Sequence, residues 1–138
     1  MTYTLVVADD AAEIRLLLRF RLGLQPDMEI VGEAEDGLMA ALLAAQHRPD
    51  AVILDWRMPG VDGIQAINLV RRASPSSRIL MYSSGQCAQA EEQALRAGAD
   101  GFFRKIDGIG TLVAAIRRVC AQSPLAGQGP AARPLNSV

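Results

Sequence analysis

The 138-residue chain has little of what several common classes of protein require. Its two cysteines, Cys87 and Cys120, are too few for a disulfide framework and indicate a reduced, cytoplasmic setting. No apolar run approaches the ~18 residues of a membrane span, and Met1–Thr4 lacks the basic segment of a signal peptide. With 14 basic and 15 acidic residues, the net charge of -1 also argues against a nucleic-acid-binding surface. We therefore expect no direct contact with a membrane or with nucleic acid.

Lysine is the scarcest charged residue, because the 14 basic residues are arginines except for Lys105. A single lysine in an arginine-rich chain favours a role for a compact ammonium group, although chance can produce the same count. Half of the residues are hydrophobic, which excludes a disordered chain and is enough for one folded domain without covalent crosslinks.

Five strand-like runs alternate with helical runs along the chain. The expected strands are 4–8, 28–33, 51–54, 78–82 and 101–104, and the expected helices are about 11–22, 37–45, 63–70, 88–97 and 109–121. In the first helix we expect Ile14, Leu17, Leu18 and Leu22 to form the core face, with Gly23 as the C-cap. This alternation predicts an α/β fold, a doubly wound parallel sheet with helices on both faces. Residues 1–122 form the domain, and the Pro- and Gly-rich residues 123–138 form a tail or linker.

Polar residues follow the carboxyl ends of four of these strands. They are Asp9, Asp10, Asp55, Ser83 and Lys105. Polar residues are common at strand ends, so each alone has an ordinary structural explanation. The carboxyl ends of parallel strands meet at one edge of the sheet, however, where open α/β sheets bind ligands. A second set of aspartates lies in turns or caps by position: Asp27, Asp50, Asp100 and Asp107.

Three carboxylates at one edge would repel one another, and a divalent cation relieves this repulsion. Their oxygens suit Mg²⁺ or Mn²⁺, which prefer oxygen ligands and an octahedral shell. An aspartate can also attack phosphorus and form an aspartyl phosphate. The charge on the transferring oxygens then needs cations and hydrogen-bond donors placed in advance, and Lys105 and Ser83 supply them.

At this point the sequence resembles the receiver domain of bacterial two-component response regulators, over about residues 3–121. The matching segments are Asp9-Asp10, Asp55–Gly63, Ser83-Ser84 and Gly98–Lys105. The resemblance implies a five-stranded, flavodoxin-like or CheY-like sheet of order 2-1-3-4-5 with five helices. It also implies that Asp55 accepts a phosphoryl group from a histidine kinase or a phosphotransfer protein.

The resemblance further implies a role for each matching residue. The metal would be held by Asp10, Asp55 and the backbone carbonyl of Arg57, with Asp9 acting through water. Lys105 would pair with the phosphoryl group, Ser83 would move to hydrogen-bond it, and Phe102 would then turn inward. This movement would reach the surface of the fourth helix, fifth strand and fifth helix, where an output partner or a second copy would bind.

Several positions depart from the common pattern or modulate it. Phe102 lacks the hydroxyl of the commoner Tyr, and Ile106 stands where the family often has Pro, so the geometry of the Lys105–Ile106 peptide is open. We expect the Arg57 side chain to pair with Asp9 or Asp10 without metal, or to shield the phosphoryl group; a solvent-facing Arg57 is the alternative. Ser84 is a further modulating residue. The segment 31–37 is similar to receivers of LuxR/NarL-type transcription factors.

Two interpretations of the receiver remain: a complete single-domain regulator, or the receiver part of a DNA-binding transcription regulator. The main alternative from another class is a phosphatase with an aspartate nucleophile, which usually needs a second Asp two residues later. Arg57 occupies that position, so we expect no enzymatic turnover beyond self-catalysed phosphorylation and dephosphorylation. A flavin-binding module is disfavoured because residues 9–13 are acidic where a phosphate-binding loop would be needed. A degenerate receiver is disfavoured because the whole residue set is present.

Overall fold

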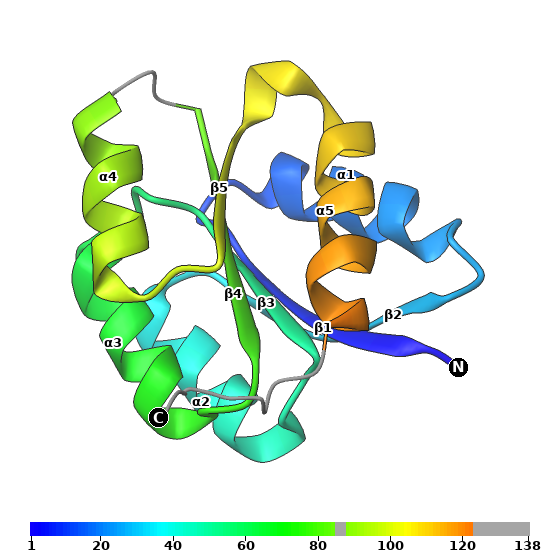
Figure 1. Cartoon of the computed structure of the whole chain (residues 1–138), viewed down its shortest axis with the longest axis horizontal. Coiled ribbons are helices and arrows are strands. Elements are labelled where there is room, and N and C mark those ends of the chain that lie inside the picture. The colour runs from blue at the N-terminus through cyan, green and yellow to red at the C-terminus, as the bar shows by residue number, and fades with distance from the viewer. Residues whose placement is uncertain (85–87, 123–138) are drawn as a thin grey trace.

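A computed structural model describes residues 1–84 and 88–122 of the chain. Its five strands form one parallel sheet in the order β2-β1-β3-β4-β5, which confirms the predicted fold class (Figure 1). The strands are β1 (Tyr3–Ala8), β2 (Met28–Ala34), β3 (Ala51–Leu54), β4 (Arg78–Ser83) and β5 (Gly101–Arg104). The helices are α1 (Ala12–Gly23), α2 (Gly37–His47), α3 (Gly63–Ala73), α4 (Ala88–Ala97) and α5 (Ile109–Ala121), with a short 3₁₀ turn at Lys105–Asp107. The predicted tail, 123–138, and Cys87 lie outside the described residues.

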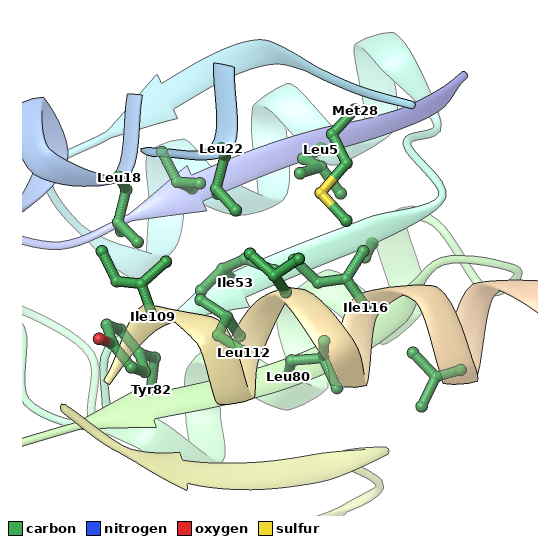
Figure 2. Close-up of a cluster of buried hydrophobic side chains, with 14 residues drawn as sticks. Leu5, Leu18, Leu22, Met28, Ile53, Leu80, Tyr82, Ile109, Leu112 and Ile116 are labelled. Atoms are coloured by element: carbon green, nitrogen blue, oxygen red, sulfur yellow. The ribbon is translucent and has the colours of Figure 1, made fainter. Parts of the chain in front are cut away.

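Helices cover both faces of the sheet, with α1 and α5 on one side and α2, α3 and α4 on the other (Figure 1). The central strand β3 serves both layers, because alternate residues of a strand point to opposite faces. Ile53 joins the cluster under α1 and α5, where Figure 2 shows it close to Leu112 of α5. Val52 and Leu54 join the cluster under α2, α3 and α4. This double burial explains why β3 is apolar throughout.

The strand register brings the polar strand ends together. Ala8 of β1 is paired with Leu54 of β3, so the next residues, Asp9 and Asp55, leave the sheet side by side. The backbone amide of Asp55 donates to the Ala8 carbonyl at 3.0 Å, which extends the ladder by one residue. Ser83 of β4 is paired with Arg104 of β5, the residue before Lys105. The polar residues predicted to meet at the carboxyl ends of the strands therefore come from four neighbouring strands.

Caps agree with the sequence pattern at two helices and differ at one. Asp36 and Asp62 cap α2 and α3, and the Asp62 cap is reciprocated by the Gln65 side chain. The predicted cap at Gly23 is wrong: this glycine is the last helical residue, and Leu24 follows with a right-handed φ of -75°. Within the described residues no helix has the length and apolarity to cross a membrane.

The predicted core face of α1 is partly wrong. Leu18 and Leu22 are buried and Ile14 packs against their cluster, but Leu17 is 44% exposed. Leu17 lies about 100° from Leu18 around the helix, too far to face the same sheet. Apolar residues surround most of α1, so periodicity alone did not identify its buried side. The Lys105–Ile106 peptide is trans, as are all peptides within the described ranges.

Candidate functional site

Three carboxylates meet at the carboxyl edge of the sheet. Asp9, Asp10 and Asp55 each offer an oxygen, and these oxygens all lie within 4.8 Å of one another. Asp9 and Asp55 are buried directly after β1 and β3, whereas Asp10 is exposed at the start of the loop into α1. Such a set of hard oxygens, open to solvent on one side, fits Mg²⁺ or Mn²⁺ with several bound waters.

Local hydrogen bonds fix Asp9 in this cluster. Its Oδ1 accepts from the backbone amide of Ala11 at 2.9 Å, and its backbone carbonyl accepts from Arg15 Nη1 at 2.6 Å. Because Arg15 lies one turn into α1, the bond ties the start of that helix to the end of β1. Asp9 is therefore held at both its side chain and its backbone.

The Lys105 ammonium lies between the two buried carboxylates. Its Nζ donates to Asp9 Oδ2 at 2.7 Å and lies 3.4 Å from Asp55 Oδ2. The same Nζ lies 5.9 Å from the centroid of the Tyr82 ring, within range of a cation–π contact. One ammonium thus partly neutralises two carboxylates, which leaves an excess of negative charge at the edge.

This arrangement shifts the pKa of both partners. Burial raises the pKa of Asp55, the positive charge of Lys105 opposes the rise, and the negative charge of Asp9 adds to it. Burial acts to lower the pKa of Lys105, but the hydrogen bond to Asp9 and the charge of Asp55 outweigh it, so that pKa is raised. Lys105 therefore stays charged at neutral pH, beside the carboxylate that would receive a phosphoryl group.

The two residues expected to act as a switch lie on neighbouring strands. Ser83 is buried at the end of β4, and Ser84, the next residue, is exposed. Phe102 of β5 is partly buried and meets Trp56 edge-on, with ring centroids 6.2 Å apart and an interplanar angle of 69°. A Cβ at Gly63 would overlap the Trp56 ring, so only glycine leaves room for it there.

Sequence reasoning missed this contact of Trp56 with Phe102. The sequence contains Trp56 directly after Asp55 and Gly63 at the start of α3, but nothing in it indicates that the Trp56 ring packs over Gly63 or against Phe102. The contact places the ring that follows the candidate phosphoacceptor against the residue expected to switch. A change at Asp55 thus has a short physical route to Phe102.

Arg57 does not pair with the acidic cluster. Its backbone amide lies 3.4 Å from Asp55 Oδ1, its side chain is exposed, and no ion pair joins it to Asp9 or Asp10 within residues 1–84 and 88–122. The expected metal-free pairing is therefore wrong, since Lys105 takes the position between the carboxylates. Arg57 instead borders a hollow of about 600 Å³ that opens beside Asp10 and is walled by Trp56, Met58 and Ile64.

A protein-family model described as the response regulator receiver domain matches residues 5–117. Among curated proteins, the protein-glutamate methylesterase/protein-glutamine glutaminase of Thermotoga maritima is 39% identical over 105 residues. This match covers 75% of the chain and 30% of that protein. The nitrate/nitrite response regulator NarL of Escherichia coli K12 is 33% identical over 102 residues, covering 74% of the chain and 47% of NarL.

The fold is also similar to solved receiver structures. The response regulator domain of Thermotoga maritima CheB superposes with a TM-score of 0.82 at 32% identity. That superposition covers 90% of the chain and all of the CheB domain. The chain thus matches a whole domain of known structure but spans less than half the length of the two curated relatives.

Proposed function

The chain belongs to the response regulator receiver family, and from this premise we propose that Asp55 accepts a phosphoryl group from a phosphohistidine of a kinase or phosphotransfer protein. The observation that carries the proposal is the position of Asp55. It is a buried carboxylate with an ammonium 3.4 Å away and two further carboxylates beside it. A buried carboxylate that serves only the fold is expected to accept hydrogen bonds from dedicated backbone or side-chain donors.

The transfer is a displacement at phosphorus. An oxygen of the Asp55 carboxylate attacks, a P–O bond forms as the P–N bond breaks, and the histidine ring leaves and takes up a proton. Lys105 is already within reach of Asp55, so it meets the negative charge that develops on the phosphoryl oxygens with little rearrangement. Its ammonium has three N–H donors, so it can keep its short hydrogen bond to Asp9 while it meets a phosphoryl oxygen.

The acidic cluster fits a divalent metal through its donor set, three carboxylates of which one is exposed. Asp10 and Asp55 would be direct ligands together with the backbone carbonyl of Arg57, and Asp9 would act through water. A bound Mg²⁺ or Mn²⁺ supplies positive charge that neutralises the carboxylates and the phosphoryl oxygens. Asp9 is less available as a direct ligand because both of its carboxylate oxygens already accept hydrogen bonds.

Phosphorylation then changes a surface at a distance from Asp55. Ser83 moves to hydrogen-bond the phosphoryl group, and Phe102 turns into the space that this movement leaves. Trp56 supports the coupling because its ring touches Phe102 and adjoins Asp55. We propose that an output partner, or a second copy of the chain, reads this change on the surface of α4, β5 and α5.

We place this reaction in the cytoplasm, in the receiver part of a NarL-like transcription regulator. The output is a property of the whole regulator, because NarL-like relatives are about twice as long as their match to this chain. A turnover enzyme finds no support at the site, since the position two residues after Asp55 is an exposed arginine.

Intact mass spectrometry tests the proposal. After incubation with Mg²⁺ and a small acyl phosphate, the protein should gain the mass of one phosphoryl group, and hydroxylamine should remove it, as it does acyl phosphates. Asp55→Asn should gain nothing. Asp107→Asn changes an exposed aspartate two residues from Lys105 and should behave as the wild type. An adduct that persists in Asp55→Asn would disprove the assignment.

A further inference from the structure

The hollow that opens beside Asp10 has no role in the phosphoryl transfer proposed above. It lies along the loop between β3 and α3, and its apolar walls are Trp56, Met58, Pro59 and Ile64. Its volume of about 600 Å³ falls within the roughly 300–1,000 Å³ that is usual for small-molecule sites. We call it the β3–α3 hollow. An apolar concavity of this size with a few polar groups at its border is typical of a ligand site.

Trp56 forms a fixed wall of the β3–α3 hollow. A Cβ at Gly63 would overlap its ring, so the ring lies tightly against the start of α3, and it also meets Phe102 edge-on. Met58 contributes an unbranched thioether, which adapts to an occupant and contacts aromatic rings favourably. Aromatic pairs likewise gain free energy beyond the burial of their area. A fixed indole beside an adaptable thioether therefore favours a flat aromatic ring as the occupant.

The charges at the border of the β3–α3 hollow favour a carboxylate on this ring. Arg57 is exposed there and takes part in no ion pair among the residues that the structure describes. Its planar guanidinium can bind a carboxylate through two parallel hydrogen bonds. Of the two carboxylates in the lining, Asp62 is occupied as the cap of α3, and Asp10 belongs to the proposed metal site. With a metal on Asp10, the unmatched charge of the hollow is therefore positive.

A second hollow, of about 620 Å³, has a different character. The described residues that line it include no cation and four carboxylates, which are Asp10, Glu33, Glu35 and Asp36. Met39 stands in its wall as Met58 does in the wall of the β3–α3 hollow. Because an acidic lining repels an anion, the second hollow is a control of similar volume that lacks a partner for a carboxylate.

We propose that the β3–α3 hollow binds a small aromatic carboxylate, with the ring against Trp56 and Met58 and the carboxylate paired with Arg57. This ligand is a second input to the domain, separate from the phosphoryl donor. Mg²⁺ and the carboxylate should each strengthen binding of the other, because the metal removes the negative charge that Asp10 otherwise presents to the ligand. This coupling rests on the metal site of the proposed function, whereas the contacts with the ring do not.

Titration of the full chain with benzoate tests the ligand class. With saturating Mg²⁺ and no phosphoryl donor, benzoate should change the fluorescence of Trp56, the single tryptophan, with a dissociation constant on the order of 1 mM, as expected for so small a ligand. Isothermal titration calorimetry gives the same constant without relying on the indole. Benzamide keeps the ring without the charge, and acetate keeps the charge without the ring. Each should bind at least about fivefold more weakly than benzoate.

Matched substitutions locate the ligand. Met58→Gln should weaken benzoate binding at least about fivefold, because an amide replaces the thioether beside the ring. The same change in the second hollow, Met39→Gln, should leave the dissociation constant unchanged. Arg57→Gln should also weaken binding about fivefold or more, because the carboxylate loses its cation. Arg118→Gln on α5, which removes another exposed arginine without an ion pair in the described part of the chain, should have no effect.

Removal of Mg²⁺ with a chelator should weaken benzoate binding about fivefold or more. An absence of benzoate binding, equal binding of benzamide, or binding that Met58→Gln and Arg57→Gln leave unchanged would overturn the proposal. If the protein binds Mg²⁺ but the chelator leaves the benzoate affinity the same, the arrangement beside Asp10 is wrong. None of these titrations uses a phosphoryl donor, so their failure leaves the proposed function of Asp55 standing. A protein that binds benzoate but takes no phosphoryl group would overturn that function alone.

Discussion

The two edges of the sheet use the same residue type for different purposes. At the edge where the strands begin, Asp27, Asp50 and Asp100 each stand directly before a strand. At the edge where the strands end, Asp9 and Asp55 each stand directly after one. The difference lies in their partners, and it separates residues that hold the fold together from residues available for chemistry.

The amino-terminal edge is closed by bonds within the chain. Asp50 accepts from the backbone amide of Thr4 at 2.8 Å and from its hydroxyl at 3.2 Å, which joins the start of β3 to β1. Asp100 accepts from the backbone amide of Ile79 at 2.8 Å and from Arg71 at 3.1 Å. Each of these carboxylates thus satisfies a group that the fold would otherwise leave unpaired.

The carboxyl-terminal edge has too few cations for its carboxylates. Asp9 and Asp55 share the Lys105 ammonium, which pairs closely with Asp9, and among the described residues no ion pair reaches Asp10. Burial raises the pKa of Asp55, so its charged form is disfavoured relative to water. A folded protein retains such a cluster at a cost in stability, and sites that bind metal or react are where this cost is usual.

The largest effect should follow from removing Asp10, the exposed carboxylate of the cluster. Asp10→Ala should abolish phosphorylation and weaken Mg²⁺ binding, because the proposed metal site loses one of its two direct carboxylate ligands. Trp56, the single tryptophan, adjoins Asp55 and should report Mg²⁺ by a change in fluorescence. Wild-type Mg²⁺ affinity in Asp10→Ala would refute the ligand assignment. If binding is confirmed separately, a flat titration means only that the ring does not sense the site.

At the amino-terminal edge we expect the removal of an aspartate to lower stability and to leave phosphorylation intact. Asp100→Ala leaves the Ile79 amide without its acceptor and removes one of the four acceptors of the Arg71 guanidinium, which should lower the free energy of unfolding by about 1–3 kcal/mol. Phosphorylation of the folded protein should be unchanged. Chemical denaturation and intact mass measure the two properties. If the variant lost phosphorylation under conditions where it is fully folded, the claim that the amino-terminal aspartates serve only the fold would be wrong.

Lys105 extends the comparison between the two edges of the sheet. At the amino-terminal edge the cations that pair with the aspartates are arginines, as in the Arg71–Asp100 ion pair. Lys105→Arg should keep Mg²⁺ binding but slow phosphorylation by about tenfold or impair the switch, since a planar guanidinium cannot replace a compact ammonium between Asp9 and Asp55. The rate of phosphoryl gain and the Mg²⁺ titration are the measurements. If Lys105→Arg were phosphorylated and activated like the wild type, the inference that this position needs a compact ammonium would be wrong.

The smallest effect is expected at Arg57, which is exposed and borders the hollow beside Asp10. Over a phosphorylated Asp55, its guanidinium can shield the phosphoryl group from water by a charge-assisted hydrogen bond. Arg57→Ala should therefore lose the phosphoryl group up to about fivefold faster, the effect of one exposed charge. The decay after donor removal, at saturating Mg²⁺, gives the rate. Unchanged or slower decay would exclude shielding and leave the receiver assignment intact.

The sequence predicted a parallel sheet, and with it the meeting of its polar strand ends at one edge, because both follow from local pattern. The order of the strands within the sheet was implied by the family resemblance. Apolar runs alternating with amphipathic ones imply parallel strands, and parallel strands bring their carboxyl ends together. The order of strands and helices along the chain was therefore enough to place Asp9, Asp55 and Lys105 at one edge. Asp50 and Asp100 were likewise identified as turn or cap residues by position, although their partners Thr4 and Ile79 lie 46 and 21 residues away.

Side-chain pairing could not be predicted in the same way. Whether Lys105 or Arg57 neutralises Asp9 depends on which side chain reaches it across the folded edge, and the structure favours Lys105. The exposure of Leu17 likewise depends on how α1 is rotated against the sheet, which a helix with apolar residues on most of its sides does not specify. Both errors concern orientation rather than the identity of the element.

The two aspartates that flank β3 test the central claim most directly. Asp50→Ala and Asp55→Ala make the same change at opposite ends of one strand, and phosphorylation and the free energy of unfolding can be measured on both. Asp50→Ala should lose about 1–3 kcal/mol of stability and still accept a phosphoryl group. Asp55→Ala should lose phosphorylation and keep or gain stability at neutral pH in the presence of a chelator, with the gain fading as the pH falls and Asp55 of the wild type becomes protonated. A strongly destabilised Asp55→Ala, or a folded Asp50→Ala that takes no phosphoryl group, would contradict the account.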